Sequence, residues 1–115
     1  MTAEDVILSS GCSCALDIVI STLADNGKNL LVPRPGFPLY KTLSEGLGIH
    51  TREYNLLPDQ DWQVDLAHME SLIDFNTAAI IVNSPSNPCG SVFSTTHLRQ
   101  ILKVAERHKV PIIGE

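Results

Sequence analysis

The chain has 115 residues, enough for one small domain that buries roughly two-thirds of its unfolded surface. Hydrophobic residues make up 43% and charged residues 18%, which is typical of a folded globular protein and excludes a disordered tail. The net charge of −5 argues against a nucleic-acid partner, which needs clustered lysine and arginine, and no apolar run approaches the roughly 20 residues of a membrane span.

The three cysteines, Cys12, Cys14 and Cys89, are odd in number and lack the spacing of a disulfide framework. Together with an amino terminus that has no signal-peptide pattern, they favour a reducing compartment, and we expect a cytoplasmic protein. The four histidines do not supply zinc-ligand spacing, so we expect no metal site and interpret the cysteines as small buried thiols.

Strands and helices alternate in the first half of the chain. Short apolar runs predict strands, and turn residues such as Asn26-Gly27 and prolines such as Pro33 interrupt them. The predicted elements are a strand at 6–10, a helix at 13–24, a strand at 30–32, a helix at 38–47 and a strand at 49–55.

The second half continues the alternation after a polar loop at 56–64. The predicted elements are a helix at 66–74 capped by Asp65, a strand at 78–83, a helix at 96–108 capped by Ser94 or Thr95, and a strand that begins at Val110. The pattern predicts a three-layer α/β sandwich with a mostly parallel sheet. Because Glu115 lies within or beside that last strand, we expect residues 1–115 to be a piece of a larger protein.

The stretch from Ile80 to Gly90 gives the clearest indication of where a ligand would bind. An apolar run at 80–82, typical of a strand buried on both faces, leads into a segment with two prolines that cannot continue it. The strand therefore brings Asn83 and Asn87 to the carboxyl edge of the sheet, where open α/β sheets bind their ligands.

Two further strand ends carry candidate binding residues. Gly11, Cys12 and Ser13 lie where a strand meets a helix, and the unpaired N–H groups of a helix amino terminus suit a phosphate. By itself this pattern is more often a plain helix cap, and it is neither a P-loop nor a dinucleotide fingerprint.

The second of these strand ends is followed by the proline-rich segment 33–40, which contains Phe37 and Tyr40. An aromatic ring held rigidly can stack on a flat heteroaromatic ring, although a core Phe and an interface Tyr are the commoner roles. Asn87 can donate an amide hydrogen bond to a phenolate oxygen. A phosphate seat, a stacking ring and a phenolate donor are parts of a pyridoxal phosphate site.

Residues 83–90, Asn-Ser-Pro-Ser-Asn-Pro-Cys-Gly, resemble the Asn-x-Pro-x-Asn-Pro-[Thr/Cys]-Gly signature of the fold-type I aminotransferases that use pyridoxal phosphate. The form that ends in Cys-Gly is most similar to the tyrosine aminotransferase branch. The resemblance covers nearly the whole chain, and its other segments are 6–13, 31–37, 54–58 and 72–74.

The resemblance implies a set of cofactor contacts. The backbone near Gly11, Cys12 and Ser13 would hold the phosphate of pyridoxal 5'-phosphate, Phe37 would stack on the pyridine ring, and Asn87 would bond the phenolic oxygen. It also implies cis peptides before Pro35 and Pro88. The implied substrates are tyrosine or a similar amino acid and a 2-oxo acid, and the whole enzyme is expected to be a homodimer.

Two departures from the family pattern matter. Glu115 falls where the family has the aspartate that pairs with the pyridine nitrogen; this is a substitution, a terminal sequence change or a one-residue misregister. The Schiff-base lysine and the substrate-binding arginine lie further along in the family, and no lysine here matches that context. We therefore interpret 1–115 as a fragment of the cofactor-binding large domain, with no catalytic residue of its own and inactive alone.

Three alternatives remain open at this stage. A lyase or decarboxylase of the same fold would differ in residues outside this stretch. A truncated, catalytically inactive isoform could act by binding or by competing for the dimer surface. A nucleotide-binding module is disfavoured because the chain has no recognised phosphate loop.

Overall fold

Two apolar runs form the centre of the sheet. In the computed structural model, which describes residues 1–115, they are β1 (Asn29–Arg34) and β4 (Thr77–Val82). The strands pair in parallel, with Leu31 opposite Ile80, and both of these side chains are fully buried. Burial on both faces explains why the runs are continuously apolar and not alternating.

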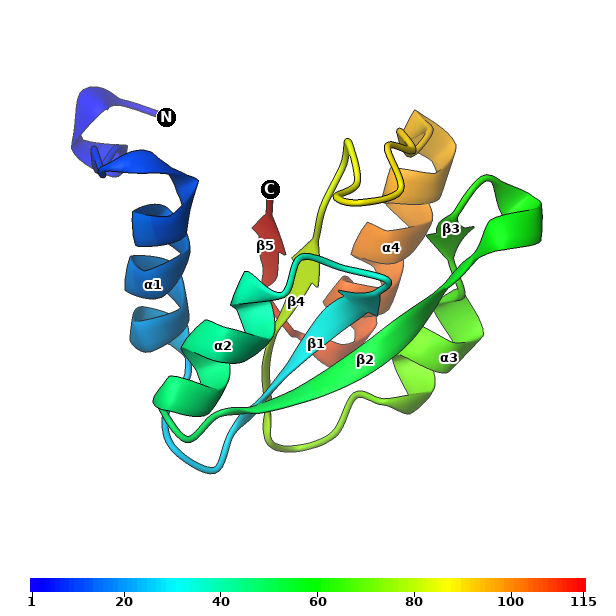
Figure 1. The fold of residues 1–115 in the computed structure, drawn as a ribbon. Helices are drawn as coiled ribbons and strands as arrows, with labels where there is room; N and C mark the ends of the chain where they lie inside the picture. Colours follow the sequence, from blue (N-terminus) through cyan, green and yellow to red (C-terminus); the bar gives the residue numbers. More distant parts are fainter.

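Three further strands complete the sheet, which has the order β3-β2-β1-β4-β5 (Figure 1). They are β2 (His50–Leu57), β3 (Gln63–Val64) and β5 (Ile112–Gly114). All pairings are parallel except β2 with β3, which is antiparallel. The mostly parallel sheet predicted from the alternation of elements is therefore confirmed.

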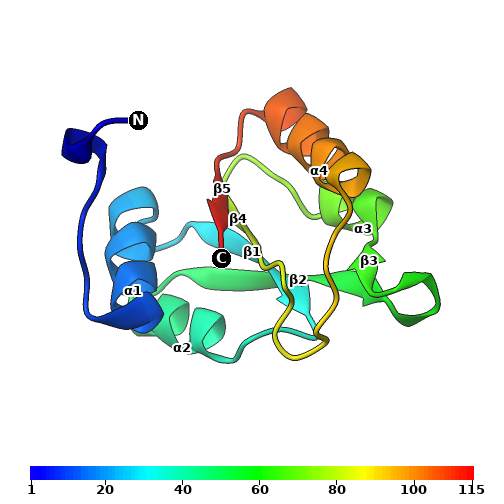
Figure 2. The same cartoon turned by 90° about the horizontal axis from the view of Figure 1, so that it is seen from above.

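Helices cover both faces of the sheet, as the view from above shows (Figure 2). The helices α1 (Gly11–Leu23) and α2 (Leu39–Gly46) lie on one face, and α3 (Leu66–Ser71) and α4 (Thr95–His108) lie on the other. Two 3-10 turns, Ala3–Asp5 and Pro58–Gln60, complete the elements. The predicted three-layer sandwich is confirmed.

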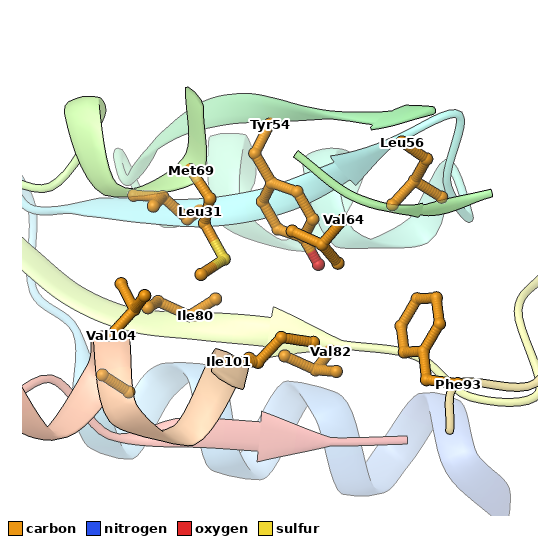
Figure 3. Close-up of a cluster of buried hydrophobic side chains, with 11 residues drawn as sticks. Leu31, Tyr54, Leu56, Val64, Met69, Ile80, Val82, Phe93, Ile101 and Val104 are labelled. Atoms are coloured by element: carbon orange, nitrogen blue, oxygen red, sulfur yellow. The ribbon is translucent and has the colours of Figure 1, made fainter. Parts of the chain in front are cut away.

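Each helix layer encloses its own apolar core. The core beside α3 and α4 contains 11 buried residues, among them Tyr54, Met69 and Ile101 (Figure 3). The core beside α1 and α2 contains 10, among them Leu16 and Tyr40. Because the two clusters are nearly equal in size, the sheet depends on both helix layers for its burial.

The predicted helix caps form as expected. A side-chain oxygen of Asp65 accepts a hydrogen bond from the backbone N–H of His68 at 3.0 Å, at the start of α3. Ser94, and not Thr95, caps α4 by accepting from the N–H of His97 at 3.1 Å. Each cap satisfies one of the N–H groups that a helix start leaves without a partner.

The strand predicted at 6–10 is wrong. Val6, Ile7 and Leu8 are 53%, 78% and 93% exposed and belong to no strand. An apolar run becomes a strand only when a neighbouring strand takes up its N–H and C=O groups, and none of the five strands pairs with this segment. The loop predicted at 56–64 is also partly wrong, because it contains the end of β2 and the whole of β3.

A buried histidine fastens β3 to α4. The Nε2 atom of His97 accepts a hydrogen bond from the N–H of Val64 at 2.9 Å, and His97 is only 4% exposed. Since Nε2 is the acceptor, Nδ1 carries the proton and faces Oε1 of Gln100 at 3.3 Å. A strand of two residues thus gains a side-chain partner from the helix layer.

Replacing His97 should destabilise the protein. His97→Leu fills the position with an apolar side chain but leaves the buried N–H of Val64 without an acceptor, which should lower the free energy of unfolding by about 1–3 kcal/mol. Urea denaturation measures this. The matched control is His50→Leu, which changes an exposed histidine on β2. Equal effects of the two changes would contradict the role given to His97.

A polar network closes the amino edge of the sheet around Asp74. One carboxylate oxygen accepts from the side-chain amide of Asn29 at 2.9 Å and from the N–H of Asn76 at 2.8 Å. The other lies 2.6 Å from the guanidinium of Arg52. The hydrogen bond from Asn29, then that from Asn76 and the charge of Arg52, lower the pKa of Asp74 below its usual value.

The network should contribute stability that disappears in acid. Because the folded-state pKa of Asp74 lies below the unfolded value of about 3.9, its contribution is complete above that value and is lost as the pH falls through the folded pKa. Asp74→Asn should therefore have a lower Tm than wild type at pH 6, and the difference should shrink toward pH 2. Thermal unfolding across this range measures it, with Asp59→Asn as the exposed control. A Tm difference independent of pH would contradict the prediction.

Candidate functional site

The carboxyl ends of β4 and β5 and the amino end of α1 meet at one edge of the sheet (Figure 1). Parallel strands place their ends together, so this edge collects the residues that follow them. The backbone of Glu115 fixes the end of β5, because its N–H donates to the carbonyl of Val82 at 3.0 Å. Its carbonyl accepts from the N–H of Ser84 at 2.9 Å, which extends the pairing into the motif loop.

Asn83 holds the motif loop in place. It is 8% exposed, and its side-chain oxygen accepts from the backbone N–H of Asn87 at 2.5 Å. Its side-chain nitrogen donates to the carbonyl of Glu115 at 3.4 Å. Asn83 therefore has a structural role, and it presents Asn87, whose exposed side-chain amide makes no hydrogen bond within the chain.

Three peptide bonds near the site are cis. The bonds before Pro35 and Pro88 were expected from the family resemblance and are confirmed. The third precedes Pro85 and was not expected.

The amino end of α1 is open to a ligand. Gly11 begins the helix at φ +78, a left-handed conformation that favours glycine. Ser10 stands at the N-cap position but makes no side-chain cap hydrogen bond, so the simple cap considered above is absent. Gly11, Cys12 and Ser13 are all exposed. The N–H of Gly11 donates to the carbonyl of Ser9 at 3.0 Å, whereas those of Cys12 and Ser13 are available to an anion.

Phe37 and Tyr40 occupy different environments at the end of β1. Phe37 is half-buried in the loop before α2. Tyr40 is only 1% exposed and lies in the core beside α1 and α2, so it is neither a stacking surface nor an exposed interface residue. The two rings pack edge to face, with centroids 5.8 Å apart.

Glu115 joins α1 and α2 to the end of β5. Its Oε1 atom accepts from the Cys12 thiol at 3.1 Å, and its Oε2 atom accepts from the Tyr40 hydroxyl. The hydrogen bond to Glu115 raises the pKa of Cys12 above its usual value. Burial, and then the hydrogen bond to Glu115, raise the pKa of Tyr40. Both groups are therefore protonated at neutral pH and act as donors.

These contacts connect three of the five site residues predicted from the sequence, Cys12, Phe37 and Asn87, while Gly11 and Ser13 are the chain neighbours of Cys12. Phe37 packs on Tyr40, Tyr40 and Cys12 bond to the side chain of Glu115, and the backbone of Glu115 bonds to Asn83, which holds Asn87. Cys12 is exposed, and Cys14 and Cys89 are only half-buried, so the expectation of buried thiols is wrong. Its role as a donor was missed, because its acceptor is 103 residues away in the sequence.

The predicted site residues are not gathered in one cavity. A cavity of about 140 Å³ is bounded by Cys12, Glu115 and apolar residues of α1. A larger apolar cleft of about 450 Å³ lies between the sheet and α4 and shares only Glu115 with the predicted site. No group of three potential metal ligands is present, and none of the helices has the length and apolar character to cross a bilayer.

Comparison with known proteins gives the family. A family model described as aminotransferase class I and II matches residues 1–114. The chain belongs to this family. It is 58% identical to human tyrosine aminotransferase over 115 residues, which cover all of this chain and 25% of that protein.

Solved structures agree with this assignment. A tyrosine aminotransferase from Leishmania infantum superposes with a TM-score of 0.95 at 39% identity, covering 96% of this chain and 30% of that one. Cystalysin from Treponema denticola, whose structure contains pyridoxal 5'-phosphate, shows the same fold with a TM-score of 0.92 at 20% identity, covering 99% and 29%. The chain thus spans about a quarter of the length of the curated relative it matches.

Proposed function

We propose that residues 1–115 are part of the pyridoxal-phosphate-binding large domain of an enzyme that moves the amino group of tyrosine or a similar amino acid to a 2-oxo acid. The observation that carries the proposal is the connected set of contacts at the carboxyl edge, which runs from Phe37 through the side chain and backbone of Glu115 to the backbone of Asn87. The 58% identity to human tyrosine aminotransferase supports the amino acid substrate.

The residues of this edge fit the chemical groups of pyridoxal phosphate. The uncapped first turn of α1, at Gly11, Cys12 and Ser13, suits the phosphate. The free side-chain amide of Asn87 suits a phenolate oxygen, and the carboxylate of Glu115 suits a ring nitrogen that carries a proton. Phe37 offers an aromatic ring beside them.

When bound, the cofactor supplies an electron sink that stabilises negative charge at the Cα atom of the substrate. The protein's contribution here is to bind and orient. Glu115 would accept a hydrogen bond from the ring N–H and so favour the positively charged ring, while Asn87 would donate to the phenolate oxygen without adding charge. Pro85 and Pro88 stiffen the loop that carries Asn87.

The proposal extends to the partners and location of the enzyme. The substrates would be an amino acid and a 2-oxo acid, with no nucleic acid and no membrane. The family resemblance supports a homodimer, and three free cysteines support the reducing environment of the cytoplasm.

Activity should require residues beyond these 115. The expressed 115-residue chain should show no amino-group transfer with added pyridoxal phosphate, because none of its lysines has the family's Schiff-base context. The full-length protein should convert tyrosine to its 2-oxo acid with one new amino acid formed per turnover.

The products separate the alternatives. Ammonia or carbon dioxide released in place of a new amino acid would indicate a lyase or a decarboxylase. A protein complete at 115 residues that binds but does not react would indicate an inactive isoform. Lysine-dependent turnover by the 115-residue chain would overturn the expectation that it is inactive.

Asn87 gives the sharpest test of the cofactor contacts. In the full-length protein, Asn87→Ala would remove a donor to a charged acceptor, an interaction worth roughly 1.5–3 kcal/mol. Loss of this donor disfavours the deprotonated phenolic oxygen. The midpoint of the absorbance pH titration of the bound cofactor should therefore rise by about one to two pH units.

The control for this titration is Asn76→Ala, an exposed asparagine in a turn at the amino edge of the sheet. It should leave the midpoint unchanged. If Asn87→Ala binds the cofactor and also titrates like wild type, Asn87 only shapes the turn before Pro88.

A further inference from the structure

The side chain of Glu115 receives one donor on each carboxylate oxygen. The Cys12 thiol donates to Oε1 at 3.1 Å, and the Tyr40 hydroxyl donates to Oε2. The donors come from the first turns of two different helices, α1 and α2. A glutamate side chain has three rotatable bonds, and two donors from separate elements restrict all of them to one orientation.

Tyr40 is itself held rigidly. Its ring is 1% exposed, packs edge to face on Phe37 and belongs to the core between the sheet and α1 and α2. The hydroxyl is the polar end of an otherwise apolar, buried side chain, so the position of its oxygen follows from the core packing. The orientation of the Glu115 carboxylate is thereby set by the core.

We propose that Tyr40 and Cys12 are positioning residues that hold the Glu115 carboxylate in the orientation in which it faces the ring nitrogen of pyridoxal phosphate. The proposal rests on the cofactor contacts proposed above. It assigns side-chain functions to a buried core tyrosine and to a cysteine whose backbone alone was expected to matter.

The protonation of the two donors suits this role. The pKa of Cys12 is raised, first by its hydrogen bond to Glu115, and that of Tyr40 is raised, first by burial. Neutral donors leave the negative charge on Glu115. A carboxylate has about four lone-pair sites, so two donors leave room for a third partner, a ring N–H.

The buried tyrosine on β2 provides a matched control. Tyr54 is also fully buried and donates its hydroxyl to a backbone carbonyl, that of Ile81, at 2.7 Å. It lies in the other core, beside α3 and α4. Tyr54→Phe therefore removes a buried hydroxyl without touching Glu115, so it reports the effect of a purely structural loss.

The test measures the dissociation constant of pyridoxal phosphate in the full-length protein by absorbance titration. Tyr40→Phe should weaken binding about tenfold, and Tyr54→Phe less than twofold. At the exposed position 12, Cys12→Ala should weaken binding severalfold, whereas Cys12→Ser, which keeps a donor, should restore most of it. Because position 12 is exposed, this pair tests the proposal even if Tyr40→Phe does not fold.

A second readout needs no cofactor. In the cofactor-free protein, Glu115→Gln removes the negative charge that favours the protonated Cys12 thiol and leaves only a neutral amide oxygen as acceptor, so alkylation of Cys12 at pH 8 should become faster. Cys14, on the same helix, serves as the internal reference in mass spectrometry.

The outcomes separate this proposal from the proposed function. If wild type binds the cofactor and Tyr40→Phe behaves like Tyr54→Phe, Tyr40 is only structural and the proposal fails. If wild type does not bind the cofactor, both proposals fail. An alkylation rate of Cys12 that Glu115→Gln leaves unchanged removes Cys12 from the carboxylate and also overturns the assignment.

Discussion

The backbone pairing at the ends of β4 and β5 is the constraint on which the site depends. Glu115 donates its N–H to the carbonyl of Val82 and accepts from the N–H of Ser84, so its Cα is fixed relative to the motif loop. The side-chain amide of Asn83 adds a third hydrogen bond, the second to the carbonyl of Glu115. Because these bonds are backbone bonds or bonds to backbone, the spacing between Glu115 and Asn87 survives changes of side chain elsewhere on the edge.

The elements that could be predicted from the sequence are those decided by local pattern. The buried runs in β1 and β4 and the caps at Asp65 and Ser94 carry their signal within a few residues. The strand predicted at 6–10 failed because pairing is not local: the apolar run of Val6 to Leu8 satisfies the pattern but has no neighbouring strand. The two-residue β3 was missed for the opposite reason: it forms although its own sequence carries no strand pattern. Its hydrogen-bond partner on α4, His97, lies far away in the sequence.

The same distinction applies to the site. Asn87 and Phe37 were chosen as candidates because each follows a strand, and parallel strands bring their ends to one edge. The turn at Gly11 was chosen for the helix that it begins, since the strand predicted before it does not form. The side-chain roles of Tyr40 and Cys12 were missed because each depends on Glu115, 75 and 103 residues away. Tyr40 itself was noticed in the proline-rich segment with Phe37, but nothing near it in the sequence indicates its acceptor.

The two edges of the sheet use their polar groups in opposite ways. At the amino edge, Asp74 takes hydrogen bonds from Asn29 and Asn76 and an ion pair from Arg52, so that the polar groups of the edge satisfy one another. At the carboxyl edge, the first turn of α1 has no side-chain cap, and the amide of Asn87 has no partner within the chain. Polar groups that are rigidly placed but unpaired are available to a ligand at little cost in ordering. The amino edge therefore serves stability, whereas the unpaired groups of the carboxyl edge support the binding site proposed above.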